Sequence, residues 1–171
     1  ASEGAKLIPT NARNKLIEEG TQKVGKELME RGLEGLAKLK QKNVEGIDEL
    51  INDISKAVLN KSEQVNVGNL KGALAHAEIA ARPEYIDNVI AVKKQIQITG
   101  VKGTDIDILL KDGKIVEAKN SYELATMGKG SELDRFREQI SKLGLYQKQH
   151  NVSAGVEVVS TQGFSSEVIA E

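Results

Sequence analysis

The stretch GTDIDILLKDGKIVEAKN, residues 103–120, decides the fold of this chain because it has the pattern of two strands joined by a tight turn. Apolar residues alternate with polar ones on both sides of Lys-Asp-Gly, as in a β-hairpin with one buried face. Acidic side chains interrupt the pattern at Asp105, Asp107 and Glu117. Because strands disfavour aspartate, these carboxylates are expected either to be exposed to solvent or to belong to a functional site.

The turn determines which side chains of the hairpin face one another. A two-residue Asp-Gly turn would pair apolar with charged side chains on both faces. A three-residue loop, Lys111 to Gly113 with the glycine in a left-handed conformation, keeps one face apolar. It places Asp107 opposite Glu117 and Asp105 opposite Lys119. We therefore predict the three-residue loop, with two carboxylates about 5 Å apart at their Cβ atoms.

The composition excludes several classes of protein. The chain has 171 residues, a net charge of −1 and no cysteine, so disulfides and cysteine-based zinc sites are excluded. No apolar run approaches the ~20 residues that span a membrane, and we expect no stable membrane span. Because the net charge is close to zero, the chain could bind nucleic acid only through a local cluster of positive charge. The chain begins with Ala and has no signal-peptide pattern, and we expect it to be a fragment of a longer protein.

Apolar spacing predicts an α/β (α+β) chain in two parts. Residues 10–62 have apolar stripes at helical spacing, and a polar stretch at 61–69 follows them. We place a helical region at 1–66 and a second domain at 67–171. The second domain is predicted to run in the order helix, strand, strand, strand, helix, strand, with these elements at 70–81, 89–100, 104–110, 114–119, 131–150 and 155–160.

Local signals refine two of these helical parts. Glycines interrupt the stripes of the first region, each at a cost of up to about 1 kcal/mol relative to alanine, and predict short or loosely held helices. In the helix at 131–150, Ser131 is the expected N-cap, with Asp134 three residues later. Its expected core stripe comprises Leu133, Phe136, Ile140 and Leu143.

The acidic hairpin suggests a site for a hard divalent cation. Mg²⁺ binds one or two carboxylates and leaves water and substrate phosphate to complete its coordination. We predict Asp107 and Glu117 as metal ligands, Asp105 as a second ligand candidate and Lys119 as the catalytic cation. Glu78, in the preceding helix, would be a third acidic contributor. The alternative is a solvated charged face with Asp105 and Lys119 as a weak surface pair.

These residues resemble the motif of the PD-(D/E)xK nuclease superfamily, which has the restriction-endonuclease-like fold. The motif here is Asp107 followed by Glu117-Ala118-Lys119, and the matching order of elements covers residues 69–160. The resemblance implies a mixed central sheet flanked by helices and a metal-dependent endonuclease that uses Mg²⁺ or another divalent cation. It implies catalytic roles for Glu78, Asp105, Asp107, Glu117 and Lys119. Gln139 with Tyr146 resembles the glutamine-containing helix that follows the motif in some members.

A narrower resemblance is to the C-terminal toxin modules of CdiA, the contact-dependent growth inhibition effectors. A helical part precedes a compact α/β part in both, and this chain lacks cysteine. The resemblance implies a secreted or cell-surface effector fragment that is delivered to the cytoplasm of a target bacterium. Residues 1–66 would serve translocation, and a cognate immunity protein would neutralise the toxin. It favours tRNA as the substrate, with DNA as the alternative.

Side chains around the hairpin and the following helix are candidate contacts to substrate. We predict Gln139, Lys142, Tyr146 and Lys102 as substrate-binding residues, although Gln139, Lys142, Tyr146 and Gln149 also suit an exposed helix face. Phosphate contacts are expected from Lys102, Lys111, Lys114, Lys129, Arg135, Arg137, Lys142 and Lys148. The alternative to an enzyme is a non-enzymatic interaction module, in which the exposed edge of the hairpin binds a partner. His76 and His150 are isolated in the sequence and support neither a zinc site nor a Ser-His-Asp triad.

Overall fold

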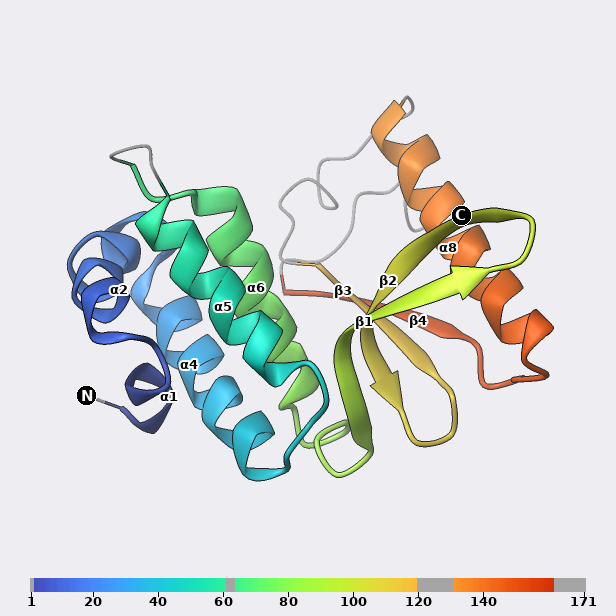
Figure 1. Ribbon diagram of the computed structural model, residues 1–171, viewed down its shortest axis with the longest axis horizontal. Coiled ribbons are helices and arrows are strands. Elements are labelled where there is room, and N and C mark those ends of the chain that lie inside the picture. The colour runs from blue at the N-terminus through green and yellow to red at the C-terminus, as the bar shows by residue number, and fades with distance from the viewer. Residues whose placement is uncertain (1, 61–63, 120–130, 162–171) are drawn as a thin grey trace.

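The computed structural model describes residues 2–60, 64–119 and 131–161. It contains helices and a mixed four-stranded sheet, which confirms the predicted α/β class. Figure 1 shows the sheet between a layer of helices from the first half of the chain and a single helix from the second half. Among the described residues, no helix is long and apolar enough to cross a membrane.

The first half of the chain folds as the predicted helical part. Its elements are α1 (Glu3–Lys6), α2 (Thr10–Lys15), the π-helical turn η1 (Leu16–Gly20), α3 (Thr21–Val24), α4 (Lys26–Gln41), α5 (Ile47–Leu59) and α6 (Val67–Ala80). The prediction of short helices holds for α1 to α3, which have four to six residues. It is wrong for α4, which continues for 16 residues through Gly32 and Gly35.

The glycines of α4 bring this helix close to α6. A Cβ atom added at Gly35 would lie 2.3 Å from the carbonyl oxygen of Ala77, and one added at Gly32 would lie 2.7 Å from the side chain of Leu74. Real Cβ atoms do not approach other atoms so closely, so only glycine permits this contact. The close packing of α4 against α6 therefore offsets the lower helix propensity of these glycines.

The second half follows the predicted order of elements. It contains β1 (Val89–Ile98), β2 (Val101–Leu110), β3 (Ile115–Lys119), α8 (Ser131–Gln149) and β4 (Val156–Ser160). The strands lie side by side in chain order; β1–β2 and β2–β3 are antiparallel, and β3–β4 is parallel. α8 begins at the predicted N-cap residue Ser131, although the side chains of Ser131 and Leu133 lie outside the described residues.

The hairpin between β2 and β3 has the predicted three-residue loop. Leu110 donates a backbone hydrogen bond to Lys114, and Gly113 has a φ of +88° in the left-handed region. Ile108 pairs with Val116 in the adjoining ladder. The apolar faces of both strands are therefore buried together, as the alternation required.

Two hydrophobic clusters hold the sheet between its helices. The larger joins the helical layer to one face of the sheet and includes Leu36, Leu74, Val92 and Ile108. The smaller joins α8 to the other face through residues that include Leu143. In α8, Leu143 is fully buried, whereas Phe136 and Ile140 are half-buried.

The predicted boundary at residue 66 falls between α5 and α6. In the structure α6 packs against α4 and α5, and one hydrophobic cluster runs from Ala5 in α1 to Ala118 in β3. The helical part thus shares its core with the sheet. Its assignment to translocation stays a prediction.

Candidate active site

The site lies where the long β1–β2 hairpin bends. Lys93 has a φ of +51°, which is rare for a residue with a side chain. It lies between the pairs Val92–Ile108 and Lys94–Ile106, and so opposite Asp107. The ladder between β2 and β3 begins one residue later, at Ile108. Asp107 therefore stands at the point where β2 turns away from β3.

Asp107 is held at this bend by hydrogen bonding. Its Oδ2 atom accepts a hydrogen bond from the backbone N–H of Ala118, with nitrogen and oxygen 2.9 Å apart. Its Oδ1 atom lies 3.6 Å from Nε2 of His76 in α6. The carboxylate is thus placed between β3 on one side and the helical layer on the other.

Glu117 is the most deeply buried acid among the described residues, with only 2% of its surface exposed. Burial, followed by the hydrogen bond and the charge of Asp107, raises the pKa of the Glu117 carboxyl to about 9; Lys119 and Gln139 act in the opposite direction. Its Oε2 atom is buried without a hydrogen-bond partner in the described part of the chain. The Glu117 carboxyl therefore keeps its proton at neutral pH.

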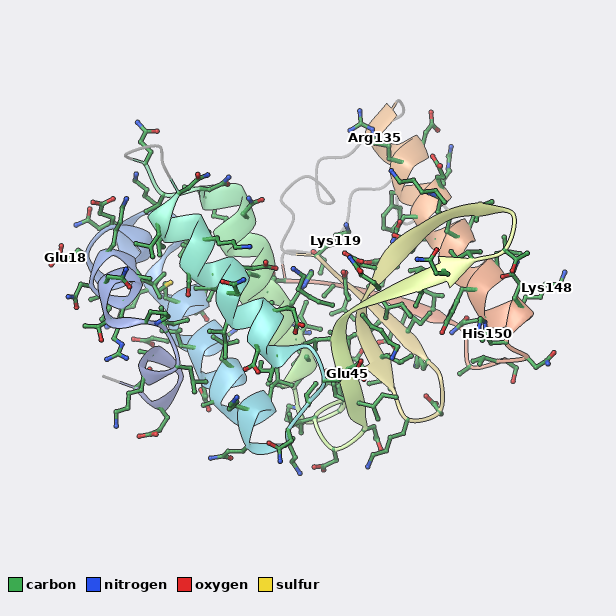
Figure 2. All side chains as sticks on the ribbon, in the orientation of Figure 1. Glu18, Glu45, Lys119, Arg135, Lys148 and His150 are labelled. Atoms are coloured by element: carbon green, nitrogen blue, oxygen red, sulfur yellow. The ribbon has the colours of Figure 1, made fainter. Side chains whose placement is uncertain are left out.

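Lys119 lies two residues after Glu117 in β3, on the same side of the strand. It is half-buried, and its charge favours ionisation of Glu117. Figure 2 shows Lys119 at the end of β3, between the helical layer and α8. The predicted group of Asp107, Glu117 and Lys119 is thus brought together.

Asp105 does not join this group. It is exposed and pairs with Gln95 of β1, in a surface hollow that Glu45 and Lys94 also line. Lys119, which the sequence placed opposite it, pairs with Ser160 of β4 instead. The prediction of Asp105 as a metal ligand at this site is not supported, because the bend carries this half of β2 away from β3.

Glu78 is also directed elsewhere. Arg82 donates two hydrogen bonds to it, from Nε to Oε1 at 3.2 Å and from Nη2 to Oε2 at 3.1 Å. Two residues along a helix correspond to a rotation of about 200°, so Glu78 and His76 lie on nearly opposite sides of α6. The residue that α6 contributes to the site is therefore His76, which is isolated in the sequence and was not predicted as a site residue. The glutamate-to-arginine spacing of four residues was the signal that Glu78 had a partner.

Of the predicted substrate contacts, Gln139 reaches the acids. It lies near Glu117, whose pKa it lowers, and its Oε1 accepts a hydrogen bond from Thr104 at 3.1 Å. Lys142 pairs with Glu138 at 3.7 Å, and Tyr146 packs in the smaller cluster and against the His150 ring. Lys102 is exposed in β2.

The predicted phosphate contacts that the structure describes are divided between β2, the β2–β3 turn and α8. Lys114 is bound to Glu157, and Figure 2 shows Lys148 at the outer end of α8, far from Lys119. Arg137 pairs with Asp134. Lys129 lies outside the described residues. The predicted contacts within the described residues therefore do not form one basic surface beside the acids.

The site could hold a divalent cation with two protein ligands, Asp107 and Glu117, rather than three. Among the described residues, no three His, Cys, Asp or Glu side chains are arranged to hold a metal ion. Mg²⁺, however, commonly binds only one or two carboxylates and completes its shell with water and substrate phosphates. The paired acids and the unpartnered Oε2 of Glu117 fit that mode, because a cation would relieve their repulsion and give that oxygen a partner.

Comparison with known proteins leaves the function to be argued from this geometry. No family model, no curated protein and no solved structure matches the chain.

Proposed function

We propose that this chain is a metal-dependent endonuclease that hydrolyses phosphodiester bonds. One observation carries the proposal: Asp107, held by the backbone N–H of Ala118, lies beside the buried carboxyl group of Glu117 on the neighbouring strand, with Lys119 two residues further along β3. Like charges facing each other across a strand pair are unfavourable. Such a pair is expected where a cation and a phosphate are to be bound.

The residues of the site have distinct parts in this reaction. Asp107 and Glu117 would hold Mg²⁺ or another divalent cation, and Glu117 would lose its proton when the ion binds. The bound ion would polarise the scissile phosphate and lower the pKa of a coordinated water. Lys119 would orient the attacking water and stabilise negative charge on the phosphate. Gln139, which lies near Glu117 and favours its ionised form, would help to orient the Glu117 carboxylate.

The test is cleavage of two nucleic acids by the purified chain. We expect cleavage of total tRNA, rather than of plasmid DNA, in Mg²⁺, and no cleavage in EDTA. Glu117→Gln and Lys119→Met should each lower the rate by roughly 10²-fold or more. Plasmid cleavage alone would assign the activity to DNA, and cleavage of neither substrate would refute the proposal.

The structure supplies matched controls for these substitutions. Glu78→Gln and Asp105→Asn remove acids of the same types that lie outside the paired site. We expect both variants to keep at least half of the wild-type rate. If they are as inactive as Glu117→Gln, the proposed site is wrong.

The toxin role is a further part of the proposal and is supported by the sequence resemblance alone. It predicts that production of the chain in the bacterial cytoplasm arrests growth and that the Glu117→Gln variant does not. An immunity protein, expected to be encoded beside the toxin, should restore growth. Arrest by Glu117→Gln at the same protein level would separate toxicity from nuclease activity.

A further inference from the structure

A groove with a volume of about 940 Å³ lies between α5 and α6, beside the proposed site. The two helices pack side by side in the helical layer (Figure 1). Nine of the fifteen residues that line the groove have amide, hydroxyl or charged side chains or an imidazole. Among the lining residues are Asn52 and Lys56 from α5, and Asn69, Gly72 and His76 from α6.

The groove leads to the paired acids. His76 lines it and places its Nε2 atom 3.6 Å from Oδ1 of Asp107. Lys93 also lines it and lies opposite Asp107 at the bend of the hairpin, where it is paired with Asp53. An extended ligand bound in the groove would therefore reach Asp107 and Glu117 from the side of the helical layer.

Two glycines of α6 keep the groove open. Gly68 and Gly72 are one helical turn apart, and a Cβ atom added at Gly72 would meet nothing within 4 Å. From Gly68 to His76 the helix rises about 12 Å, which corresponds to three or four nucleotides at about 3.4 Å each. A volume of about 940 Å³ is in the range of small-ligand sites, which suits a few nucleotides of one strand better than a duplex.

The polar side chains in the lining are suited to nucleotides. Asparagine amides both donate and accept hydrogen bonds, as base edges and ribose hydroxyls do, and lysine binds phosphate. The side chains of Asn52, Lys56 and Asn69 are exposed and make no hydrogen bond or ion pair with the part of the chain that the structure describes. They are therefore available to a ligand.

We infer that this groove binds a single-stranded segment of RNA next to the scissile phosphate. The inference rests on the proposed function and narrows its substrate class to RNAs with an unpaired end or loop beside the cleavage site. Single strands are the form in which proteins read RNA bases, and the ribose hydroxyl gives the groove amides a further partner. The helical part would then belong to the substrate site.

The first test fills the groove and measures binding without cleavage. A fluorescent single-stranded RNA of about 12 nucleotides is titrated with protein in EDTA, and its anisotropy gives the dissociation constant. Gly72→Leu adds a side chain where the structure has open space, and we expect about tenfold weaker binding. Gly144→Leu is the matched control: Gly144 is an exposed helical glycine of α8 with equally open surroundings, and affinity should not change.

A second variant leaves the shape of the groove intact. Lys56→Ala removes one exposed cation from the groove, so the slope of log K against log salt should become shallower by about 0.7. Lys26→Ala removes an exposed lysine of α4 outside the groove and should leave the slope unchanged. Because both lysines are exposed, neither variant is expected to unfold.

The outcomes of these tests are separable from the test of the nuclease. Unchanged RNA affinity in Gly72→Leu or an unchanged salt slope in Lys56→Ala overturns the inference, even if the protein cleaves nucleic acid. Equal affinity for single-stranded DNA, or for duplex RNA of the same length, also overturns it. Weakened single-strand binding in Gly72→Leu supports the groove even if no cleavage is found, and only the proposed catalysis then fails.

Discussion

The backbone N–H of Ala118 donates a hydrogen bond to Oδ2 of Asp107 across the hairpin, with nitrogen and oxygen 2.9 Å apart. In a regular antiparallel pair the acceptor would be a backbone carbonyl group. Here a side chain takes that place, because β2 bends away from β3 at Asp107. The charge-assisted bond fixes the Asp107 carboxylate beside Glu117. The shape of the backbone thus brings the two acids together.

Replacing Glu117 with Gln should stabilise the metal-free protein, and more so as pH rises. Because its pKa is raised to about 9 in the folded state from 4.5, the folded protein holds one more proton than the unfolded chain between these values. The stability of the wild type therefore falls as pH rises through this window, at up to about 1.4 kcal/mol per pH unit. Gln cannot ionise, so urea denaturation in EDTA at several pH values should show a flatter profile.

The control for this prediction is Glu18→Gln. Glu18 is an exposed acid of η1 at the far end of the helical layer (Figure 2), and its replacement should leave the pH profile of the wild type unchanged. A Glu117→Gln profile parallel to that of the wild type would show that Glu117 does not hold a proton near neutral pH.

Mg²⁺ should raise the melting temperature of the wild type but not that of Asp107→Asn. A ligand that binds only the folded state stabilises it by RT ln(1 + [L]/Kd), about 2.7 kcal/mol when its concentration is 100 times Kd. The effect should grow with pH, because the proton of Glu117 must leave for the ion to bind. Thermal unfolding with Mg²⁺ or EDTA at two pH values measures both effects. An equal shift in Asp107→Asn would place the ion elsewhere.

The hairpin could be predicted from the sequence because its signals are local. Lys-Asp-Gly is a recognisable loop, Gly113 is suited to the left-handed position, and a strand period of two leaves one register that buries the apolar face. That register was enough to bring Asp107 and Glu117 together. It was not enough for Asp105, because the bend occurs at Lys93, a residue with no local preference for a positive φ.

The contribution of α6 could not be predicted, for a different reason. An amphipathic helix shows which side meets the core, but α6 is lined with alanine and is buried on most sides. Its sequence therefore gives no preference between the side of His76 and that of Glu78. Glu78 was favoured because it is acidic, whereas the packing of α6 against α4 turns it towards Arg82.

Replacing Gln147 with Leu should destabilise the fold without a direct effect on the acids. Gln147 is buried, and its Nε2 atom donates to the carbonyl oxygens of Gly113 at 3.1 Å and Gly155 at 2.6 Å, joining the hairpin turn to the start of β4. Leu would leave both carbonyl groups without this donor, and we expect a loss of about 2–4 kcal/mol in the free energy of unfolding. Urea denaturation measures the loss.

A second glutamine of α8 provides the comparison for Gln147. Gln149 also makes two hydrogen bonds, to the backbone N–H and carbonyl of Thr99, but it is exposed. Water can replace those bonds, so Gln149→Leu should cost about 1 kcal/mol or less. Equal losses in the two variants would mean that burial does not determine the strength of these contacts.

Replacing Glu157 with Gln should make the protein less sensitive to acid. The Glu157 carboxylate of β4 accepts hydrogen bonds from Lys114, at 2.7 Å, and from the hydroxyl of Tyr85. These two bonds, that of Lys114 first, hold the pKa of Glu157 below its usual value of 4.5. The stability that Glu157 contributes is therefore present above about pH 4.5 and is lost as pH falls through its lower pKa in the folded state.

The measurement is the free energy of unfolding between about pH 6 and pH 2. As pH falls, Glu157→Gln should lose less of this free energy than the wild type does. The control is Glu27→Gln, which changes an exposed acid paired with Arg31 and should behave like the wild type. Parallel losses in all three proteins would show that the contacts of Glu157 with Lys114 and Tyr85 do not stabilise the fold.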